Sequence, residues 1–331
     1  MKTAAAPARR GGRRRAADPG SGPRAPGNGL PPATSRATAV PGTLRDLVSL
    51  TKPRVISLLL VTTVVPMLIA TGRLPSLQLV LWTLLGGYLM AGGANAINMW
   101  VDRDIDLRMA RTRTRPIPSG RMRPATALVY GLTLAATAFA ILFVGANPLA
   151  AILALGGLLF YVFVYTLTLK RSSPQNIVIG GAAGAFPPLV GWAAAMGALD
   201  VTALLLFAIV FYWTPPHFWA LALVKRRDYE SAGVPMLPVV CGERETKVHV
   251  LLYSLILVPV TLLPVATGSM GWLYAAAALG LGAQLLRLVL GLLRSEETHA
   301  PAWRLYRFSL LYLALLFAAM TADRLLTTAA A

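Results

Sequence analysis

The sequence predicts an all-α membrane protein, a polytopic bundle of about nine transmembrane helices. Hydrophobic residues make up 56% of the 331 residues, and charged residues only 13%. Soluble domains carry about 25% charged residues, so this chain has too few to cover a water-facing surface. Two further observations lead to the same fold class: a series of long apolar stretches, and the placement of the basic residues between them.

The apolar stretches are each long enough to cross about 30 Å of hydrocarbon as a helix. They cover approximately residues 54–71, 77–99, 124–144, 148–169, 176–196, 201–224, 247–267, 271–293 and 305–326. Several contain proline, which a membrane helix tolerates where neighbouring helices satisfy the freed carbonyls. The cluster Gly180, Gly181 and Gly184 is typical of close helix–helix contact. We therefore expect one transmembrane domain over residues 43–331.

Residues 1–42 differ sharply in composition from the rest of the chain. They are rich in Ala, Pro, Gly and Arg and contain almost no large apolar side chains. Such a segment cannot bury enough surface to offset its ordering entropy, and it has no apolar run of the kind found in a secretory signal. We predict a disordered basic tail that reinforces the membrane topology. Contact of its arginines with nucleic acid or anionic lipid is the less favoured alternative.

The basic residues predict the orientation of the bundle. If the tail is cytoplasmic, 29 of the 31 Lys and Arg residues fall on the cytoplasmic side, and only Arg73 and Arg324 fall outside. By the positive-inside rule the N-terminus is then cytoplasmic and the C-terminus outside. The same distribution explains the net charge of +18 without a nucleic-acid partner. The single cysteine, Cys241, excludes a disulfide framework.

The most informative polar residues lie where the second apolar stretch ends. Asn98, Asp102 and Asp106 are spaced i, i+4, i+8, so on a helix they share one face. Acidic side chains at a membrane boundary are costly unless a positive group joins them. Mg²⁺ is typically bound by one or two carboxylates and by substrate phosphate oxygens. We interpret the trio as ligands of a metal-bound phosphate. An acidic helix end paired with its own arginines is the alternative.

These residues form the motif NxxxDxxxD, which resembles the first motif of the UbiA superfamily of membrane prenyltransferases, and more narrowly the branch of that superfamily that farnesylates haem. Further stretches resemble that branch in matching order. The matching stretches are TKPRV (51–55), DRDIDLRMARTRTRP (102–116), YTLTLKR (165–171), TPPHFWALAL (214–223) and DYESAGVPMLPVVCG (228–242).

The resemblance implies that farnesyl diphosphate, haem B and water react to give haem O and diphosphate. It implies Mg²⁺ as cofactor, a multi-pass location in the plasma membrane with a cytoplasmic active site, and a haem A synthase as a further candidate partner. The second family motif, DxxxD, is incomplete here, because Ala232 stands four residues after Asp228, where the motif has its second Asp. Asp228 is therefore the best candidate for a second metal contact.

The site residues expected from the motif and the resemblance fall into two sets. The catalytic set is Asn98, Asp102, Asp106, Lys170 and Asp228, and its members other than Lys170 are the expected metal ligands. The substrate-binding set is Lys52, Arg54, Arg111, Arg115, Tyr165, Arg171 and His217. For Tyr165, a place in the interfacial aromatic belt is an equal alternative.

His217 is the only histidine in the interior of a predicted span, since His249 and His299 lie at helix ends. It either contacts the haem iron, shuttles a proton near the reacting vinyl group, or is a neutral core residue with one hydrogen bond. Two rival functions remain: a relative that prenylates another acceptor, such as an aromatic acid or quinone precursor, and a haem-handling or transport protein without chemistry. A transporter predicts inverted repeats and charges at the midplane, and the sequence shows neither clearly.

Overall fold

The computed structural model describes residues 43–330, so the predicted tail 1–42 lies outside the described residues. The described part of the chain is helical, and it contains nine helices or helix pairs long and apolar enough to cross a membrane. The predicted spans are confirmed to within about six residues at their ends. The largest differences are at the starts of the seventh and ninth spans, which begin at Gly242 and His299. There the helix continues past the apolar stretch into polar sequence.

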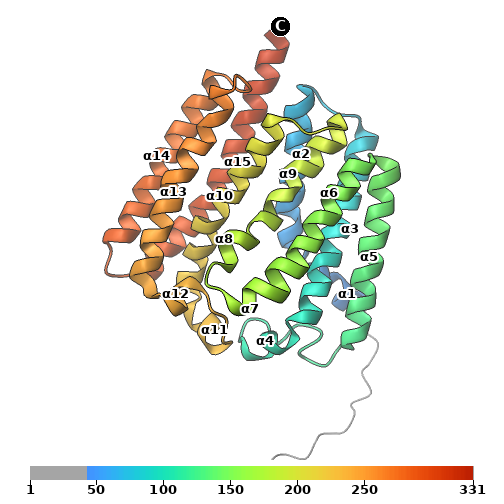
Figure 1. The fold of residues 1–331 in the computed structure, drawn as a ribbon, viewed down its shortest axis with the longest axis vertical. Helices are drawn as coiled ribbons and strands as arrows, with labels where there is room; N and C mark the ends of the chain where they lie inside the picture. The colour runs from blue at the N-terminus through green and yellow to red at the C-terminus, as the bar shows by residue number, and fades with distance from the viewer. Residues whose placement is uncertain (1–42, 331) are drawn as a thin grey trace, which may run out of the picture. The chain divides into compact units, whose positions relative to one another are not determined.

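Figure 1 shows these helices side by side with the short helices gathered at the lower end. The membrane-crossing elements are α2 (Pro53–Thr71), α3 (Leu77–Val101), α5 (Pro124–Gly145), α6 (Pro148–Leu159) with η1 (Phe160–Leu169), α8 (Asn176–Gly180) with α9 (Ala182–Met196), α10 (Val201–Val224), α13 (Gly242–Ala266), α14 (Trp272–Arg294) and α15 (His299–Ala330). The short helices are α1 (Leu44–Thr51), α4 (Arg103–Arg108), α7 (Lys170–Ser172), α11 (Arg226–Ser231) and α12 (Leu237–Val240).

Local sequence explains where many of these helices begin. The side chains of Ser76, Asn147 and Asp200 each accept a hydrogen bond from a backbone N–H in the first turn of α3, α6 and α10. Such caps satisfy donors that have no partner within the helix. Pro53 and Pro124 occupy the first position of α2 and α5, where the missing N–H costs nothing.

Glycine allows the closest helix contacts in the bundle. A Cβ atom on Gly191 of α9 would lie 1.8 Å from the backbone oxygen of Thr63 in α2. A Cβ on Gly93 of α3 would lie 2.7 Å from the carbonyl oxygen of Gly131 in α5. Close backbone contacts at small residues are common between membrane helices. The expected packing role is also confirmed for Gly180 and Gly181, whose added Cβ atoms would clash, whereas Gly184 faces open space.

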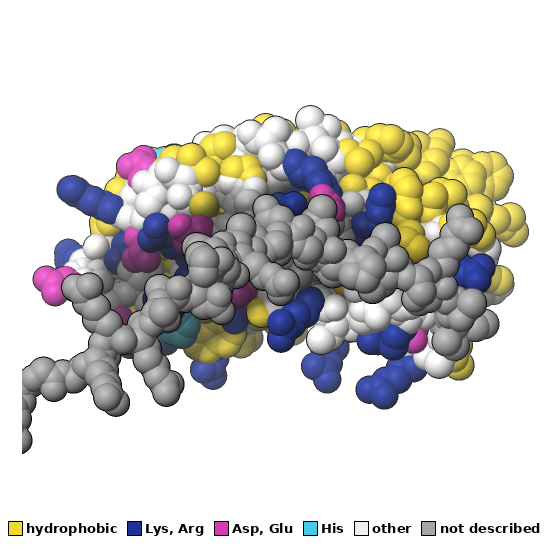
Figure 2. Space-filling view, turned by 90° about the horizontal axis from the view of Figure 1, so that it is seen from below, with side chains coloured by type: hydrophobic (Ala, Val, Ile, Leu, Met, Phe, Trp, Pro, Cys, Tyr) yellow, Lys and Arg dark blue, Asp and Glu magenta, His cyan; other side chains and the backbone are white. Residues whose placement is uncertain are grey.

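The lower end of the bundle in Figure 1, formed by α1, α4, α7, α11 and α12, is polar, and we call it the polar end. Seen from this end, Lys and Arg side chains are spread over the surface with several carboxylates among them (Figure 2). Large apolar side chains such as Val129, Leu204 and Leu279 are instead exposed along the flanks of the helices. This division is the one that a membrane-embedded bundle requires.

Candidate active site

The predicted trio lies at the junction of α3 and α4, on the polar end of the bundle. The backbone N–H of Asp102 donates to the carbonyl of Asn98, and that of Asp106 donates to the carbonyl of Asp102, at 2.9 and 2.8 Å. The helical spacing therefore continues across the junction, as the sequence predicted. Asn98, Asp102 and Asp106 are 3%, 1% and 2% exposed. Burial of two carboxylates to this degree requires positive partners.

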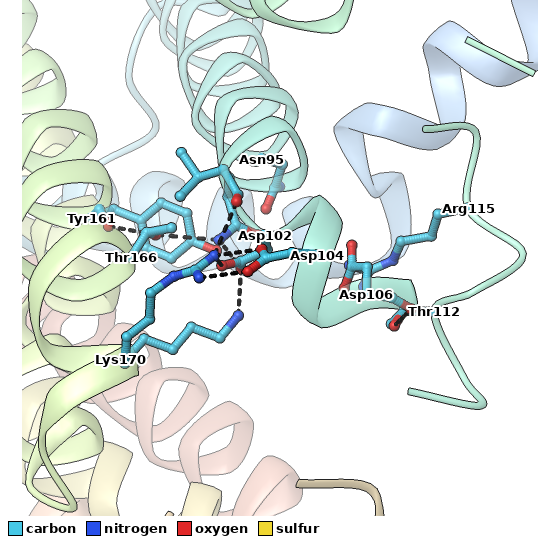
Figure 3. A network of polar contacts seen from close by, with 12 residues as sticks. Asn95, Asp102, Asp104, Asp106, Thr112, Arg115, Tyr161, Thr166 and Lys170 are labelled. Carbon is cyan, nitrogen blue, oxygen red and sulfur yellow. Dashed lines mark hydrogen bonds and ion pairs between the residues drawn. The ribbon is translucent and has the colours of Figure 1, made fainter. Parts of the chain in front are cut away.

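Asp102 is surrounded by donors from two elements, α3 and α7 (Figure 3). Its Oδ2 forms an ion pair with Lys170 of α7 and accepts a hydrogen bond from Asn98 Nδ2 at 2.7 Å. Arg171 approaches Oδ1 at 3.7 Å, which is too long for a hydrogen bond. Oδ1 is thus a buried carboxylate oxygen without a hydrogen-bond partner among the described residues. An acceptor left open in this way fits a site that receives a cation.

Asp106 has a separate partner. Arg115 Nη1 contacts both of its oxygens, at 2.9 and 2.7 Å. The loop that carries Arg115 is fixed by Thr112, whose hydroxyl donates to the carbonyl oxygen of Asp106 at 3.0 Å. Lys170 and Arg115 thus lie beside the two acids. Each buried acid is neutralised by a cation that a phosphate group could also bind.

Lys52 connects α1 and α2 to the same site. It adopts a left-handed backbone conformation, with φ of 56°, between the end of α1 and Pro53. Its Nζ donates to Asn95 Oδ1 at 3.1 Å and to Asn98 Oδ1 at 3.3 Å. The residue as a whole is half-buried. Burial of the ammonium group, with the charges of Arg115 and Lys170, lowers the pKa of Lys52 to about 7.

Asn95 is a site residue that the sequence did not single out. It is 8% exposed, and its Nδ2 donates to the carbonyl of Thr51 at 2.9 Å while its Oδ1 accepts from Lys52. Asn95 therefore fixes both the backbone and the amine of the Thr51–Lys52 turn. Its position one turn before Asn98 on an otherwise apolar helix was the available signal.

The segment that precedes Lys170 is a π-helix, η1, which the sequence did not predict. Such segments are rare and often occur at functional sites. Within η1, Thr166 is fully buried and accepts a hydrogen bond from Asn98 Nδ2 at 3.2 Å. Tyr165 stacks on Tyr161 with 5.5 Å between ring centroids. A Cβ on Gly180 would lie 2.2 Å from the Tyr165 ring, so this ring packs against α8.

Other predicted residues are less closely engaged. Arg111 and Arg54 are exposed, and no side-chain hydrogen bond or ion pair of theirs is found within residues 43–330. Asp228 is half-buried on α11, beside Tyr229, and lines an open pocket of about 540 Å³ with Arg226 and Glu243. Burial raises the pKa of Tyr229, which also senses the charges of Arg111, Lys170 and Asp228.

The expected metal ligands do not form a preassembled acidic cluster. Within the described residues, no three or more His, Cys, Asp or Glu side chains are grouped as a metal site requires. Asp102 and Asp106 are instead each paired with a cation, Lys170 and Arg115.

His217 lies apart from these contacts, between α10 and α15. It is 6% exposed, and its Nδ1 is 2.7 Å from the hydroxyl of Ser309. Trp213 and Tyr306 stack on its ring, with centroid distances of 4.3 and 4.8 Å. This single hydrogen bond agrees with the alternative that His217 is a neutral core residue. Only one of its two ring nitrogens, Nδ1, has a hydrogen-bond partner among the described residues.

Comparison with known proteins places the chain in a family. A model of the UbiA prenyltransferase family matches residues 58–319. A protein from Chloroflexus aurantiacus named protoheme IX farnesyltransferase is 57% identical over 281 residues, which cover 85% of this chain and 48% of that protein. One of the same name from Symbiobacterium thermophilum is 54% identical over 85% of this chain and 94% of its own length.

The chain thus spans about half the length of several of its curated relatives and nearly all of others. The fold also matches the solved structure of a UbiA homologue from Archaeoglobus fulgidus bound to GPP and Mg²⁺. That match has a TM-score of 0.59 and 18% identity, and covers 83% of this chain and 99% of the other. The family model, these relatives and the shared helical bundle show that the chain belongs to the UbiA prenyltransferase family.

Proposed function

We propose that this protein transfers the farnesyl group of farnesyl diphosphate to haem B, with addition of water, and releases haem O and diphosphate. The observation that carries the proposal is the pairing of two buried acids, Asp102 and Asp106, with Lys170 and Arg115 at the polar end of an apolar bundle. The relatives named protoheme IX farnesyltransferase support the choice of acceptor.

The charge balance of the site suits a diphosphate leaving group. Ionisation of an allylic diphosphate breaks a C–O bond and leaves negative charge on the phosphate oxygens, which fixed cationic donors stabilise. Lys170, Arg115, Arg171 and Lys52 are already gathered at the acids. In our proposal they move to the phosphate oxygens when substrate binds, and Tyr165 closes the apolar side of the site.

The donor set fits Mg²⁺, and its open acceptor, Asp102 Oδ1, is the observation that supports it. Asn98, Asp102 and Asp106 would hold the ion, and Asp228 would supply a second contact from α11. When bound, Mg²⁺ neutralises the leaving diphosphate. The Mg²⁺ in the Archaeoglobus fulgidus structure agrees with this assignment.

The acceptor side uses the vinyl group of haem. A vinyl carbon forms the new C–C bond with the farnesyl cation, and water adds to the resulting cation with loss of a proton, so that atoms and charges balance. We propose that His217 contacts the haem. We place the protein in the plasma membrane with the polar end toward the cytoplasm, since this end carries most Lys and Arg residues. A haem A synthase would consume the product.

The test is reconstitution of the full chain into liposomes with Mg²⁺ and labelled farnesyl diphosphate. Haem B, 4-hydroxybenzoate and a quinone precursor are offered in parallel, and products are separated by chromatography. We expect a farnesylated product with haem alone, and loss of product with EDTA that excess Mg²⁺ reverses. Transfer to an aromatic acid instead of haem would assign another acceptor. Haem binding without transfer to any acceptor would leave a non-catalytic haem-handling protein.

A further inference from the structure

Ser309 of α15 makes contacts that together enclose His217. Its backbone oxygen accepts a hydrogen bond from Trp213 Nε1 at 2.8 Å. Its hydroxyl oxygen lies 2.8 Å from the carbonyl oxygen of Tyr306 and 2.7 Å from His217 Nδ1. Ser309 is 1% exposed, so water does not compete for these bonds. Ser309 therefore contacts His217 and also both residues that stack on it, Trp213 and Tyr306.

A count of protons fixes the tautomer of His217. The carbonyl oxygen of Tyr306 has no proton, so the short contact between it and Ser309 Oγ requires the serine proton. The contact between Ser309 Oγ and His217 Nδ1 needs a proton too, and the hydroxyl has only one. His217 must supply it from Nδ1. In the neutral imidazole, Nε2 then carries an unshared electron pair.

The imidazole ring cannot easily turn to exchange its nitrogens. Trp213 and Tyr306 stack on it with interplanar angles of 18° and 27°. The two rings lie on opposite faces of the imidazole, since two rings stacked at these distances cannot share one face. Trp213 is itself held by its bond to Ser309. The ring edge that bears Nε2 is therefore fixed in direction as well as in protonation.

Nε2 is the one ring nitrogen left without a role in the fold. No described residue hydrogen-bonds it, and it is not among the fully enclosed polar atoms that lack a partner. A purely structural histidine would normally use or bury both nitrogens. An oriented imidazole with one N–H bonded to a neighbour and the other nitrogen open is the usual arrangement of a metal-binding histidine.

We propose that Ser309 is a positioning residue that presents His217 Nε2 to the iron of the haem substrate. The proposal rests on the proposed function for the identity of the metalloporphyrin, and it adds the site and the residue that prepares it. The serine acts through the histidine and does not touch the substrate. The iron–imidazole bond would hold the macrocycle on the Nε2 side of the His217 ring.

The tautomer is testable without substrate. The chain has three histidines, so nitrogen-15 spectra of the labelled full-length protein in lipid give three ring systems, and His217→Phe assigns one of them. We expect a protonated Nδ1 and an unprotonated Nε2 at His217. Ser309→Ala should abolish this preference, whereas Ser309→Thr, which keeps the hydroxyl, should restore it. A protonated Nε2 in the wild-type protein would overturn the proposal.

The second measurement is titration of the reconstituted full chain with ferric haem, followed by absorption and electron paramagnetic resonance. We expect an imidazole-ligated spectrum that is lost in His217→Gly and regained when free imidazole is added. Ser309→Ala should weaken haem binding by about tenfold, the effect of one lost hydrogen bond on an oriented ligand. Ser309→Thr should bind nearly as the wild type does.

The matched control is Ser254→Ala. Ser254 is a fully buried helix serine whose hydroxyl donates only to the carbonyl of Val250, so its loss should change neither spectrum nor affinity. Equal effects of Ser254→Ala and Ser309→Ala, or a haem spectrum indifferent to His217, would refute the positioning role. Farnesyl diphosphate binding, measured on the same samples, should be unchanged throughout, so failure here is distinct from failure of the transfer reaction.

Discussion

At the scale of the residue, the candidate site consists of buried carboxylates paired with Lys and Arg side chains. Asp102 and Asp106 are buried deeply enough to be unstable alone, and Lys170 and Arg115 compensate them. The same cations are suited to phosphate. Asp104 lies between Asp102 and Asp106 in the sequence, but its side chain is 54% exposed. It is paired with Arg171, whose guanidinium lowers the pKa of the Asp104 carboxyl. Depth therefore separates the residues of the site from a surface pair.

Replacement of the buried acids tests this distinction. We expect Asp102→Ala or Asp106→Ala to slow farnesyl transfer by about 10²-fold or more, corresponding to roughly 3 kcal/mol of transition-state stabilisation. Asp106→Asn should be nearly as damaging, because it keeps the shape and removes the charge. Asp104→Ala is the control, and should stay within about fivefold of wild type, as expected for an exposed pair. Near-normal turnover in Asp102→Ala at normal membrane abundance would refute the metal–diphosphate assignment.

Lys52 gives a prediction about protons. With a pKa of about 7, lowered by burial and by Arg115 and Lys170, Lys52 is mostly neutral at pH 8 in the empty site. A bound diphosphate favours the charged ammonium and raises this pKa. Binding of an unreactive farnesyl diphosphate analogue at pH 8 should therefore take up protons, and less so at pH 6, where Lys52 is already charged.

Calorimetry in buffers of different ionisation enthalpy measures this uptake. Lys52→Arg is the control, since a guanidinium stays charged at both pH values. The uptake at pH 8 should fall in that variant. Equal proton uptake by the wild type and Lys52→Arg would show that Lys52 does not titrate in the site.

At the scale of the element, the site depends on helices that pack closely against one another at glycine residues. The predicted spans located the helices. Apolar stretches do not tell which helices contact one another. The π-helix η1 and the Lys52 turn could not be predicted either, because both depend on tertiary contacts. The i, i+4, i+8 spacing correctly predicted the shared face of Asn98, Asp102 and Asp106. Arg115 belongs to the same sequence stretch as the acids, whereas Lys170 belongs to a stretch distant in sequence. Asn95 was missed because it belongs to no motif.

Glycine contacts give a prediction at this scale. Gly191→Ala would place a Cβ 1.8 Å from the Thr63 backbone oxygen, so α9 and α2 must separate, at a cost of about 1–3 kcal/mol for overpacking. Gly184→Ala, on the same helix and facing open space, should be neutral or slightly stabilising because alanine favours helix. Thermal unfolding in detergent compares the two variants. Equal midpoints would mean that the α2–α9 contact is not tight.

At the scale of the whole molecule, an apolar bundle carries one polar end, and all the ion pairs of the candidate site lie there (Figures 1 and 3). Such a bundle can accept two lipid-soluble substrates from the bilayer while the diphosphate stays at the polar end. Composition and charge placement were sufficient to predict this architecture. The orientation of His217, on which the proposed haem contact rests, could not be predicted from sequence, since it depends on how α10 packs against α15.

The tail provides a prediction at this scale. No described contact of the site requires residues 1–42, so their deletion should leave specific activity within about a factor of two. Activity per folded molecule is to be compared for the full chain and for a chain beginning at residue 43. A large loss of specific activity with unchanged thermal stability would show that the tail contributes to the site.

The most direct test of the central claim is the fate of the oxygen atom during transfer. The full chain is reconstituted with haem B, farnesyl diphosphate and Mg²⁺ in ¹⁸O-labelled water, and the porphyrin product is analysed by mass spectrometry. We predict a product that has gained one farnesyl group and one labelled hydroxyl, and that forms about 10²-fold or more slowly with Asp102→Ala than with the wild type. Unaltered haem B after incubation with the folded protein, or a prenylated product without the label, would contradict the account.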